Sequence, residues 1–143
     1  QKRTINVMDI KFDFEKDGKS FFGQIYTPTA KVSFYNSSRS NWVTAWLIVD
    51  TGADMTTLPK YMAESLNISL ERDCWKDKTN GVGGNEIVYI YKQKIKVRLG
   101  DNERTVPISF LNTDRIPALL GRLGFLETFD TEFLKSHVVV FKN

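Results

Sequence analysis

One short motif, Asp50-Thr51-Gly52, stands at a position where it could carry chemistry. It follows residues 42–49, a run that is almost entirely apolar and rich in β-branched and aromatic side chains. Such a run is typical of a strand that is buried on both faces. A carboxylate at the end of a buried strand is costly unless it is paired or protonated. The position of Asp50 therefore indicates a functional acid, and the alternative is a turn residue at a strand end.

A second carboxylate beside Asp50 would make acid–base catalysis by the motif possible. Two carboxylates held together cannot both ionise easily, so they share one proton and titrate as a unit. One oxygen can then act as a base toward water while another offers a proton to a carbonyl. This chemistry suits amide hydrolysis and needs no metal, cofactor or covalent intermediate. Gly52 would let the backbone turn close to the carboxylate, and the Thr51 hydroxyl can hydrogen-bond to a neighbouring loop.

Two further segments follow the motif along the chain. Residues 81–84 (Gly-Val-Gly-Gly) form the glycine-rich tip of a predicted hairpin. A mobile hairpin near an active site can cover the substrate and exclude water, and the alternative is a plain tight hairpin. Residues 118–122 (Ala-Leu-Leu-Gly-Arg) join a short apolar strand to a predicted helix.

These segments, in this order, resemble the retroviral-type aspartic proteases, or retropepsins. The matching segments are residues 47–54 (Leu-Ile-Val-Asp-Thr-Gly-Ala-Asp), 81–84 and 118–122, and the resemblance spans roughly residues 21–129. It implies an all-β fold, a closed β-barrel half-lobe with one or two short helices. It also implies an aspartic endopeptidase that cleaves extended polypeptides at an active site on a twofold dimer interface.

The resemblance implies a role for each matched residue. Asp50, Thr51 and Gly52 would form the catalytic motif, with Thr51 joining the active-site loops of two subunits. The substrate would be bound by Ala53, Asp54, Val82, Gly83 and Gly84. Structural support for the loop would come from Leu120, Gly121 and Arg122.

An ion pair between Arg122 and Asp54 would brace the active-site loop. The resemblance implies this pair, and it is plausible on its own terms because a guanidinium suits bidentate contacts with a carboxylate. An arginine near a helix N-terminus is mildly unfavourable, which favours a paired role. The alternative is a residue in the first turn of a helix that points to solvent.

The mechanism needs two carboxylates, but the chain holds one Asp that is followed by Thr-Gly or Ser-Gly. Asp130-Thr131 is followed by Glu132, and a chain of 143 residues leaves no room for a second lobe. A symmetric dimer would bring Asp50 and its copy together at the twofold axis. We therefore expect a homodimer, and no activity from the monomer.

The pattern along the chain predicts short strands with two short helices. Asp17-Gly18 predicts a hairpin turn within residues 16–19, between strands at 5–14 and 20–25. Pro59 would open a helix over residues 60–66, and a second helix is predicted over 122–129. The remaining strands are expected at residues 30–35, 42–49, 89–99, 106–111, 118–120 and 137–141, with turns at 36–41 and 100–102.

Composition predicts one globular domain over residues 1–143, in which residues 1–20 are an N-terminal extension or hairpin. Apolar residues make up 41% and charged residues 26%, and the net charge of +3 includes no basic run, which disfavours nucleic-acid binding. A single cysteine, no leader and no apolar stretch of about 20 residues favour a cytoplasmic protein without a membrane span. His137 is the only histidine, and we expect it to have a structural role. We therefore expect no metal site.

Two other functions stay open beside the endopeptidase. A protease-like fold can serve as a dimerisation or peptide-binding module with negligible hydrolysis, because fold does not guarantee chemistry. The intact Asp-Thr-Gly motif argues against this alternative. The chain could also be one domain released from a larger precursor, which the start at Gln1 is compatible with.

Overall fold

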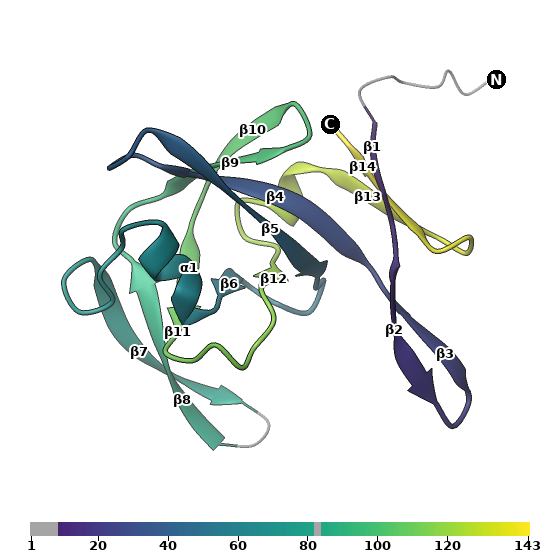
Figure 1. Cartoon of the computed structure of the whole chain (residues 1–143), viewed down its shortest axis with the longest axis horizontal. Coiled ribbons are helices and arrows are strands. Elements are labelled where there is room, and N and C mark those ends of the chain that lie inside the picture. The colour runs from purple at the N-terminus through teal and green to yellow at the C-terminus, as the bar shows by residue number, and fades with distance from the viewer. Residues whose placement is uncertain (1–8, 82–83) are drawn as a thin grey trace.

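The computed structural model describes residues 9–81 and 84–143, with backbone alone at residues 79–81, 84 and 85 (Figure 1). In chain order the elements are β1 (Ile10–Asp13), β2 (Glu15–Ser20), β3 (Gly23–Thr27), β4 (Thr29–Asn36), β5 (Asn41–Val49), β6 (Thr56–Leu58), α1 (Lys60–Ser65), β7 (Cys74–Gly81), β8 (Gly84–Tyr91), β9 (Ile95–Leu99), β10 (Asn102–Val106), β11 (Ile108–Leu111), β12 (Leu119–Leu120), the 3-10 helix η1 (Leu126–Thr128), β13 (Asp130–Leu134) and β14 (Val138–Lys142). The fold is mostly β, as predicted. Within the described ranges, no helix has the length and apolar character needed to cross a membrane.

Most strands belong to one nine-stranded sheet with the order β10-β9-β4-β5-β12-β6-β11-β8-β7. Its pairs are antiparallel except for β5 with β12 and β6 with β11, which run parallel. The order starts at β10 and ends at β7, and within the described residues no pairing joins these two edges. The prediction of a closed barrel was therefore wrong, and the sheet is open.

The long antiparallel pair of β4 and β5 forms the centre of the fold. Ala30, Val32 and Phe34 alternate along β4 and are fully buried, as the period of two predicts. In β5 the prediction of burial on both faces was wrong, because one face alone lies on the core. Leu47 is fully buried there, whereas Trp46 is 56% exposed, and its ring makes an edge-to-face contact with the ring of Phe12 in β1.

The first predicted helix is present and the second is mostly absent. Pro59 precedes α1, which buries Met62 and Ala63 against the core. Residues 122–129 form turns and the short η1 instead of a helix. Gly124 has a φ of +67°, a left-handed conformation that a right-handed helix cannot contain.

The structure has a hairpin at residues 15–27, but the predicted pairing of a strand at 5–14 with one at 20–25 was wrong, because β1 at Ile10–Asp13 pairs with β14 instead. The hairpin of β2 and β3 reverses at Phe21-Phe22 rather than at Asp17-Gly18, within the predicted turn of residues 16–19. The register shifts between Lys16 and Lys19, and Gly18 has a φ of +84° there, so the Asp-Gly pair forms an irregularity within the strand. Figure 1 shows this hairpin projecting away from the nine-stranded sheet.

Two further strand predictions needed correction. The single strand expected over residues 89–99 is divided into β8 and β9, because the chain bends at residues 92–94. The segment of β13 was not predicted as a strand, although it pairs along its whole length with β14. Together with β1, these two strands form a separate sheet with the order β1-β14-β13.

The single cysteine provides a direct test of the core. Cys74 is 5% exposed. Burial first, and then the charge of Asp73, raise the pKa of its thiol from 9.0 to about 11. Since the thiolate is the reactive form, we expect a chromogenic disulfide reagent near pH 8 to modify the folded protein far more slowly than the chain in urea. Equal rates would contradict the burial, and Cys74→Ala provides the blank.

The raised pKa also sets a pH dependence of stability. The folded state holds the thiol proton more tightly than the unfolded chain, so this stabilisation is complete below about pH 9. It is lost as the pH rises toward about 11.

Candidate active site

The Asp50 loop begins where β5 leaves the sheet. Parallel pairing places Leu120 of β12 beside Val49, and the Asp50 N–H donates to the Leu120 carbonyl at 3.0 Å. Leu120 is fully buried, so the start of the loop is fixed to the core. The strand predicted at residues 42–49 therefore leads directly into the candidate site, although only one of its faces is buried.

The carboxylate of Asp50 is half-buried and held by its own turn. Its Oδ1 accepts a hydrogen bond from the Gly52 N–H at 2.9 Å, and the Ala53 N–H donates to the Asp50 carbonyl at 3.2 Å. A Cβ on Gly52 would lie 3.2 Å from the same Oδ1, so the glycine lets the backbone approach closely. Thr51 at the tip of the turn is exposed. The carboxylate is thus oriented but still open to solvent in the single chain.

Arg122 clamps this loop from the other side, as predicted. Its Nη2 donates to Asp54 Oδ1 at 2.5 Å and its Nη1 donates to the Thr51 carbonyl at 2.5 Å. The backbone adds two bonds, from the Arg122 N–H to Ala53 and from the Leu123 N–H to Asp54. The predicted ion pair is present, and the alternative of a solvent-facing arginine was wrong. The guanidinium joins both ends of the turn that carries Asp50.

Gly121 makes the close contact between this clamp and the next strand. Its N–H donates to Thr56 Oγ1 at 3.1 Å. A Cβ at Gly121 would lie 2.3 Å from the carbonyl carbon and oxygen of Met55 and 2.8 Å from the backbone nitrogen of Thr56. No residue with a side chain fits there, so glycine is required for the loop and β12 to pack together.

The same loop is matched in comparisons with known proteins. Residues 37–122 match the sequence profile of a family described as aspartyl protease. The chain belongs to this aspartyl protease family. It is also similar to a solved structure of a retropepsin-like aspartic protease from Rickettsia conorii, with a TM-score of 0.64 and 19% identity over 94% of this chain and 99% of that chain. The aspartyl protease family and the retropepsin-like fold are thereby confirmed. No curated protein matches the chain.

The part of the chain matched to the aspartyl protease family includes the glycine-rich hairpin. β7 pairs with β8 from Cys74 and Tyr91 to Gly81 and Gly84, and β8 also pairs with β11. This fixes the base of the hairpin to the sheet, and Figure 1 shows the end of β7 and the start of β8 extending away from the body. Val82 and Gly83 lie outside the described residues, so their predicted contact with substrate stays a prediction.

The family resemblance did not indicate a hollow beside the loop, which we call the loop-side groove. It has a volume of about 250 Å³ and is mostly apolar. Its lining consists of Thr51, Arg122, Leu126, Glu127, Phe129, Thr131 and Phe133. Sequence reasoning missed it because residues 129–133 were not recognised as a strand. The alternation of Phe129, Thr131 and Phe133 is the period-two signal that could have revealed one wall.

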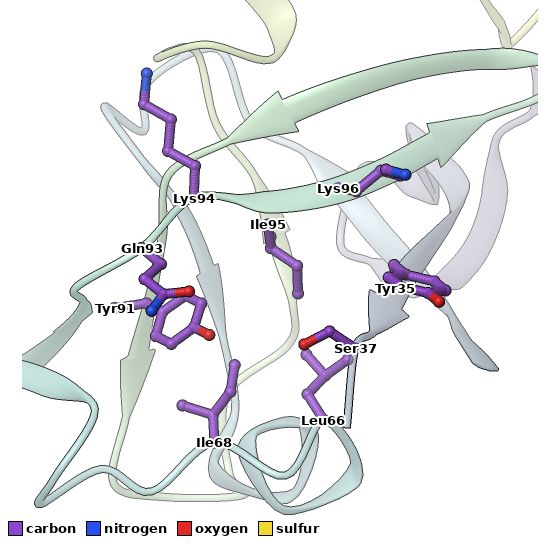
Figure 2. Close-up of a pocket in the computed structure, with 9 residues that line it drawn as sticks. All are labelled: Tyr35, Ser37, Leu66, Ile68, Tyr91, Gln93, Lys94, Ile95 and Lys96. Carbon is purple, nitrogen blue, oxygen red and sulfur yellow. The ribbon is translucent and has the colours of Figure 1, made fainter. Parts of the chain in front are cut away.

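A different hollow, between α1 and the start of β9, shows no link to this chemistry (Figure 2). It has a volume of about 180 Å³, and none of the described residues that line it carries a carboxylate. Figure 2 shows the Lys94 ammonium directed away from Leu66 and Ile68, while the Lys96 ammonium lies 5.4 Å from the centre of the Tyr35 ring. The described part of the chain also contains no cluster of three His, Cys, Asp or Glu side chains suited to a metal ion.

Proposed function

We propose that the chain is an aspartic endopeptidase that works as a homodimer. The observation that carries the proposal is the orientation of the Asp50 carboxylate. It is held by the Gly52 N–H at the end of β5, in a loop that Arg122 clamps. Membership of the aspartyl protease family supports the same chemistry.

The dimer supplies the second carboxylate. Asp54, the nearest acidic residue along the chain, is engaged by Arg122 and is not free to act as the partner of Asp50. A twofold axis beside Asp50 would place its copy within hydrogen-bond distance, and the exposed Thr51 of each subunit would face its counterpart. The active site is then complete in the dimer alone.

The two carboxylates share one proton and cleave the peptide through an activated water. The ionised carboxylate takes a proton from water as the water oxygen attacks the carbonyl carbon, and the protonated carboxyl protonates the carbonyl oxygen. In the resulting diol, the carboxyl pair protonates the amide nitrogen and takes a proton from one hydroxyl as the C–N bond breaks. The products are a carboxylic acid and an amine, and the pair again holds one proton.

The substrate would lie as an extended strand between the Asp50 loop and the β7–β8 hairpin. The Asp54 side chain is 88% exposed, and its Oδ1 is the oxygen that Arg122 engages. Its other oxygen can therefore accept a backbone N–H of the substrate, next to Ala53. Val82, Gly83 and Gly84 would close over the strand from the hairpin tip.

Cleavage of a mixed peptide library tests the proposal. The wild-type protein would be assayed from about pH 3 to about pH 8, where shared-proton carboxylate pairs operate, and sized under the same conditions. We expect a dimer that cuts peptides, with specific activity falling on dilution below the dimer dissociation constant. If the folded dimer binds peptides but cuts none at any pH, the chain is a peptide-binding module and not a protease.

The clamp predicts that Arg122→Lys impairs catalysis more than folding. A lysine ammonium cannot span both the Thr51 carbonyl and Asp54, so the loop loses one of its two contacts. We expect cleavage to fall by about tenfold because the carboxylate is less well positioned. The free energy of unfolding should change by less than about 1 kcal/mol because the Arg122 and Asp54 side chains are 46% and 88% exposed.

Arg98→Lys is the matched control for this clamp variant. Arg98 also forms an ion pair, with Glu103 on the neighbouring strand, and both side chains are about half exposed. The Arg98→Lys protein should cleave peptides at the wild-type rate. If both variants cleave at the wild-type rate, the clamp does not position the loop.

A further inference from the structure

The outer face of β4, β5 and β9 carries two neighbouring aromatic rings, and a cation lies over each of them. Trp42 of β5 is paired with Tyr35 of β4, and their ring centres are 5.1 Å apart. The Arg98 guanidinium lies 4.1 Å from the centre of the Trp42 ring, and the Lys96 ammonium lies 5.4 Å from that of Tyr35. These four side chains alternate with residues that pack in the core, so they point away from it. We call them the basic–aromatic face.

The hollow of Figure 2 continues this face. Tyr35 and Lys96 line the hollow and also belong to the face. Ile68 contributes to an apolar wall, and Figure 2 shows the Gln93 side-chain amide beside the Tyr91 ring. The volume of about 180 Å³ lies below the roughly 300 Å³ at which pockets for drug-sized ligands begin. A single flat ring suits such a space better than a whole cofactor does.

Cations from separate segments meet along this surface. Lys94 lines the hollow just before Lys96 and Arg98 of β9, and Arg39 is exposed in the turn between β4 and β5. These cations form no run in the sequence, which is why the sequence disfavoured nucleic-acid binding. The register of the sheet brings them together, and a concentration of cations attracts a polyanion.

The carboxylates near this surface are engaged or lie to one side. Glu103 is paired with Arg98, whose Nε and Nη2 each lie 2.9 Å from the Glu103 Oε1. An arginine that is bound at its edge keeps its plane for stacking. Asp73 accepts a backbone N–H at 2.7 Å and is not among the described residues that line the hollow. Asp13 and Glu15 line a separate hollow toward the other end of β5. The surface thus keeps an excess of positive charge.

We propose that the basic–aromatic face and the hollow of Figure 2 bind single-stranded nucleic acid. Bases of single strands stack on aromatic rings and on guanidinium planes, and Trp42 with Arg98 offers both. One base enters the hollow, where the Gln93 amide can donate to its edge and accept from it. The phosphates lie along Lys94 and Lys96. A duplex keeps its bases stacked inside and cannot use the site in this way.

The proposed site lies away from the candidate active site. Trp42 stands eight residues before Asp50 on the strand that leads into the catalytic loop, which corresponds to about 27 Å. A bound strand therefore leaves the Asp50 loop open to peptides. The inference does not rest on the proposed function, because binding to this face needs no cleavage.

Labelled oligonucleotides test the inference without any peptide substrate. Fluorescence anisotropy would be measured at about 0.15 M salt with strands of about 12 thymidines or uridines, and with an abasic strand that has the same phosphates. We expect a dissociation constant of about 10⁻⁴ to 10⁻⁶ M for the strands with bases. The abasic strand and a blunt duplex should bind about tenfold more weakly, because neither offers free bases to stack.

Removal of one ring tests the stacking. Trp42→Ala should weaken binding of the thymidine strand by about tenfold, while the affinity for the abasic strand stays the same. Trp75→Ala is the matched control, because Trp75 is also exposed but lies on β7. It should bind the thymidine strand like the wild type. A folded Trp42→Ala protein with wild-type affinity for the thymidine strand would overturn the inference.

Removal of two cations tests the phosphate contacts, and it still decides if Trp42→Ala fails to fold. Lys94 and Lys96 are exposed, so Lys94→Gln/Lys96→Gln should fold like the wild type. Each phosphate contact with a single strand adds about 0.7 to the slope of log affinity against log salt, so the double variant should lose about 1.4. Lys76→Gln is the control, because Lys76 also lies over a tyrosine ring, 5.8 Å from the centre of Tyr89, but on β7. An unchanged slope in the double variant contradicts the inference.

The remaining outcomes identify the ligand or reject the site. Tighter binding of the uridine strand assigns the site to RNA through its 2′-hydroxyl groups, and tighter binding of the thymidine strand assigns it to DNA, so both support the inference. No binding at about 10⁻⁴ M protein, or equal binding of the abasic strand, overturns it. A wild-type protein that binds the strands and cleaves no peptide removes the proposed function and leaves this inference standing.

Discussion

Asp50→Asn should abolish peptide cleavage while leaving the fold and the dimer intact. The asparagine side chain has the same shape and its oxygen can still accept the Gly52 N–H, so the turn keeps its hydrogen bond. It cannot hold the proton that the reaction passes between water, carbonyl and amine. Because general acid–base catalysis contributes about 10² to 10⁴-fold, and this residue does both parts, we expect a loss of at least about a thousandfold.

The measurement is the initial rate on a peptide that the wild type cleaves, with circular dichroism and sedimentation on the same samples. Asp130→Asn is the matched control, because Asp130 is exposed and is also followed by a threonine, yet lies outside the loop. It should cleave at the wild-type rate. A folded, dimeric Asp50→Asn protein with undiminished activity would rule out Asp50 as the catalytic acid.

Gly121→Ala should cause the largest loss of stability among single methyl additions in the loop. The new Cβ would lie 2.3 Å from the Met55 backbone, and neither backbone can yield without breaking the bond from the Gly121 N–H to Thr56. Overpacking typically costs 1–3 kcal/mol and a clash with backbone lies at or above that range, so we expect about 3 kcal/mol or more. Urea unfolding at a fixed protomer concentration would measure it.

Gly52→Ala is the comparison for this variant. Its added methyl meets the Asp50 carboxylate at 3.2 Å, and a side chain can move where a backbone cannot. We expect a stability loss of less than about 1 kcal/mol, together with reduced cleavage because the carboxylate shifts. If Gly121→Ala unfolds at the same urea concentration as the wild type, the close packing of β12 against residues 55–56 is not as tight as the structure shows.

The sequence by itself was enough to locate the candidate catalytic residue and the elements around it. The alternation of Ala30, Val32 and Phe34 predicted β4, and Pro59 predicted the start of α1. These signals succeed because side-chain period and helix entry depend on residues a few positions apart. The Asp50 motif was readable for the same reason, since a carboxylate directly after an apolar strand is a local anomaly.

Local signals failed where the tertiary structure chose between competing turns. Asp17-Gly18 is a strong hairpin dipeptide, yet the hairpin of residues 15–27 turns at Phe21-Phe22, and the Asp-Gly pair lies in the strand as an irregularity. The helix predicted over residues 122–129 does not form, and Gly124 within this segment has a left-handed φ that suits its close approach to Pro107. In both places the local conformational preference of the dipeptide or segment contributes less to the stability of the fold than tertiary packing does.

Long-range pairing alone decided how the site is built. Arg122 reaches the Thr51 carbonyl across 71 residues of sequence, and the parallel pair of β5 and β12 brings them together. The loop-side groove likewise exists because β13 pairs with β14 and turns Phe129 and Phe133 toward the Asp50 loop. A residue pattern records which face of a strand is apolar, but not which distant strand will cover it. That choice depends on the burial and backbone hydrogen bonds of the whole sheet, which form together when the chain folds.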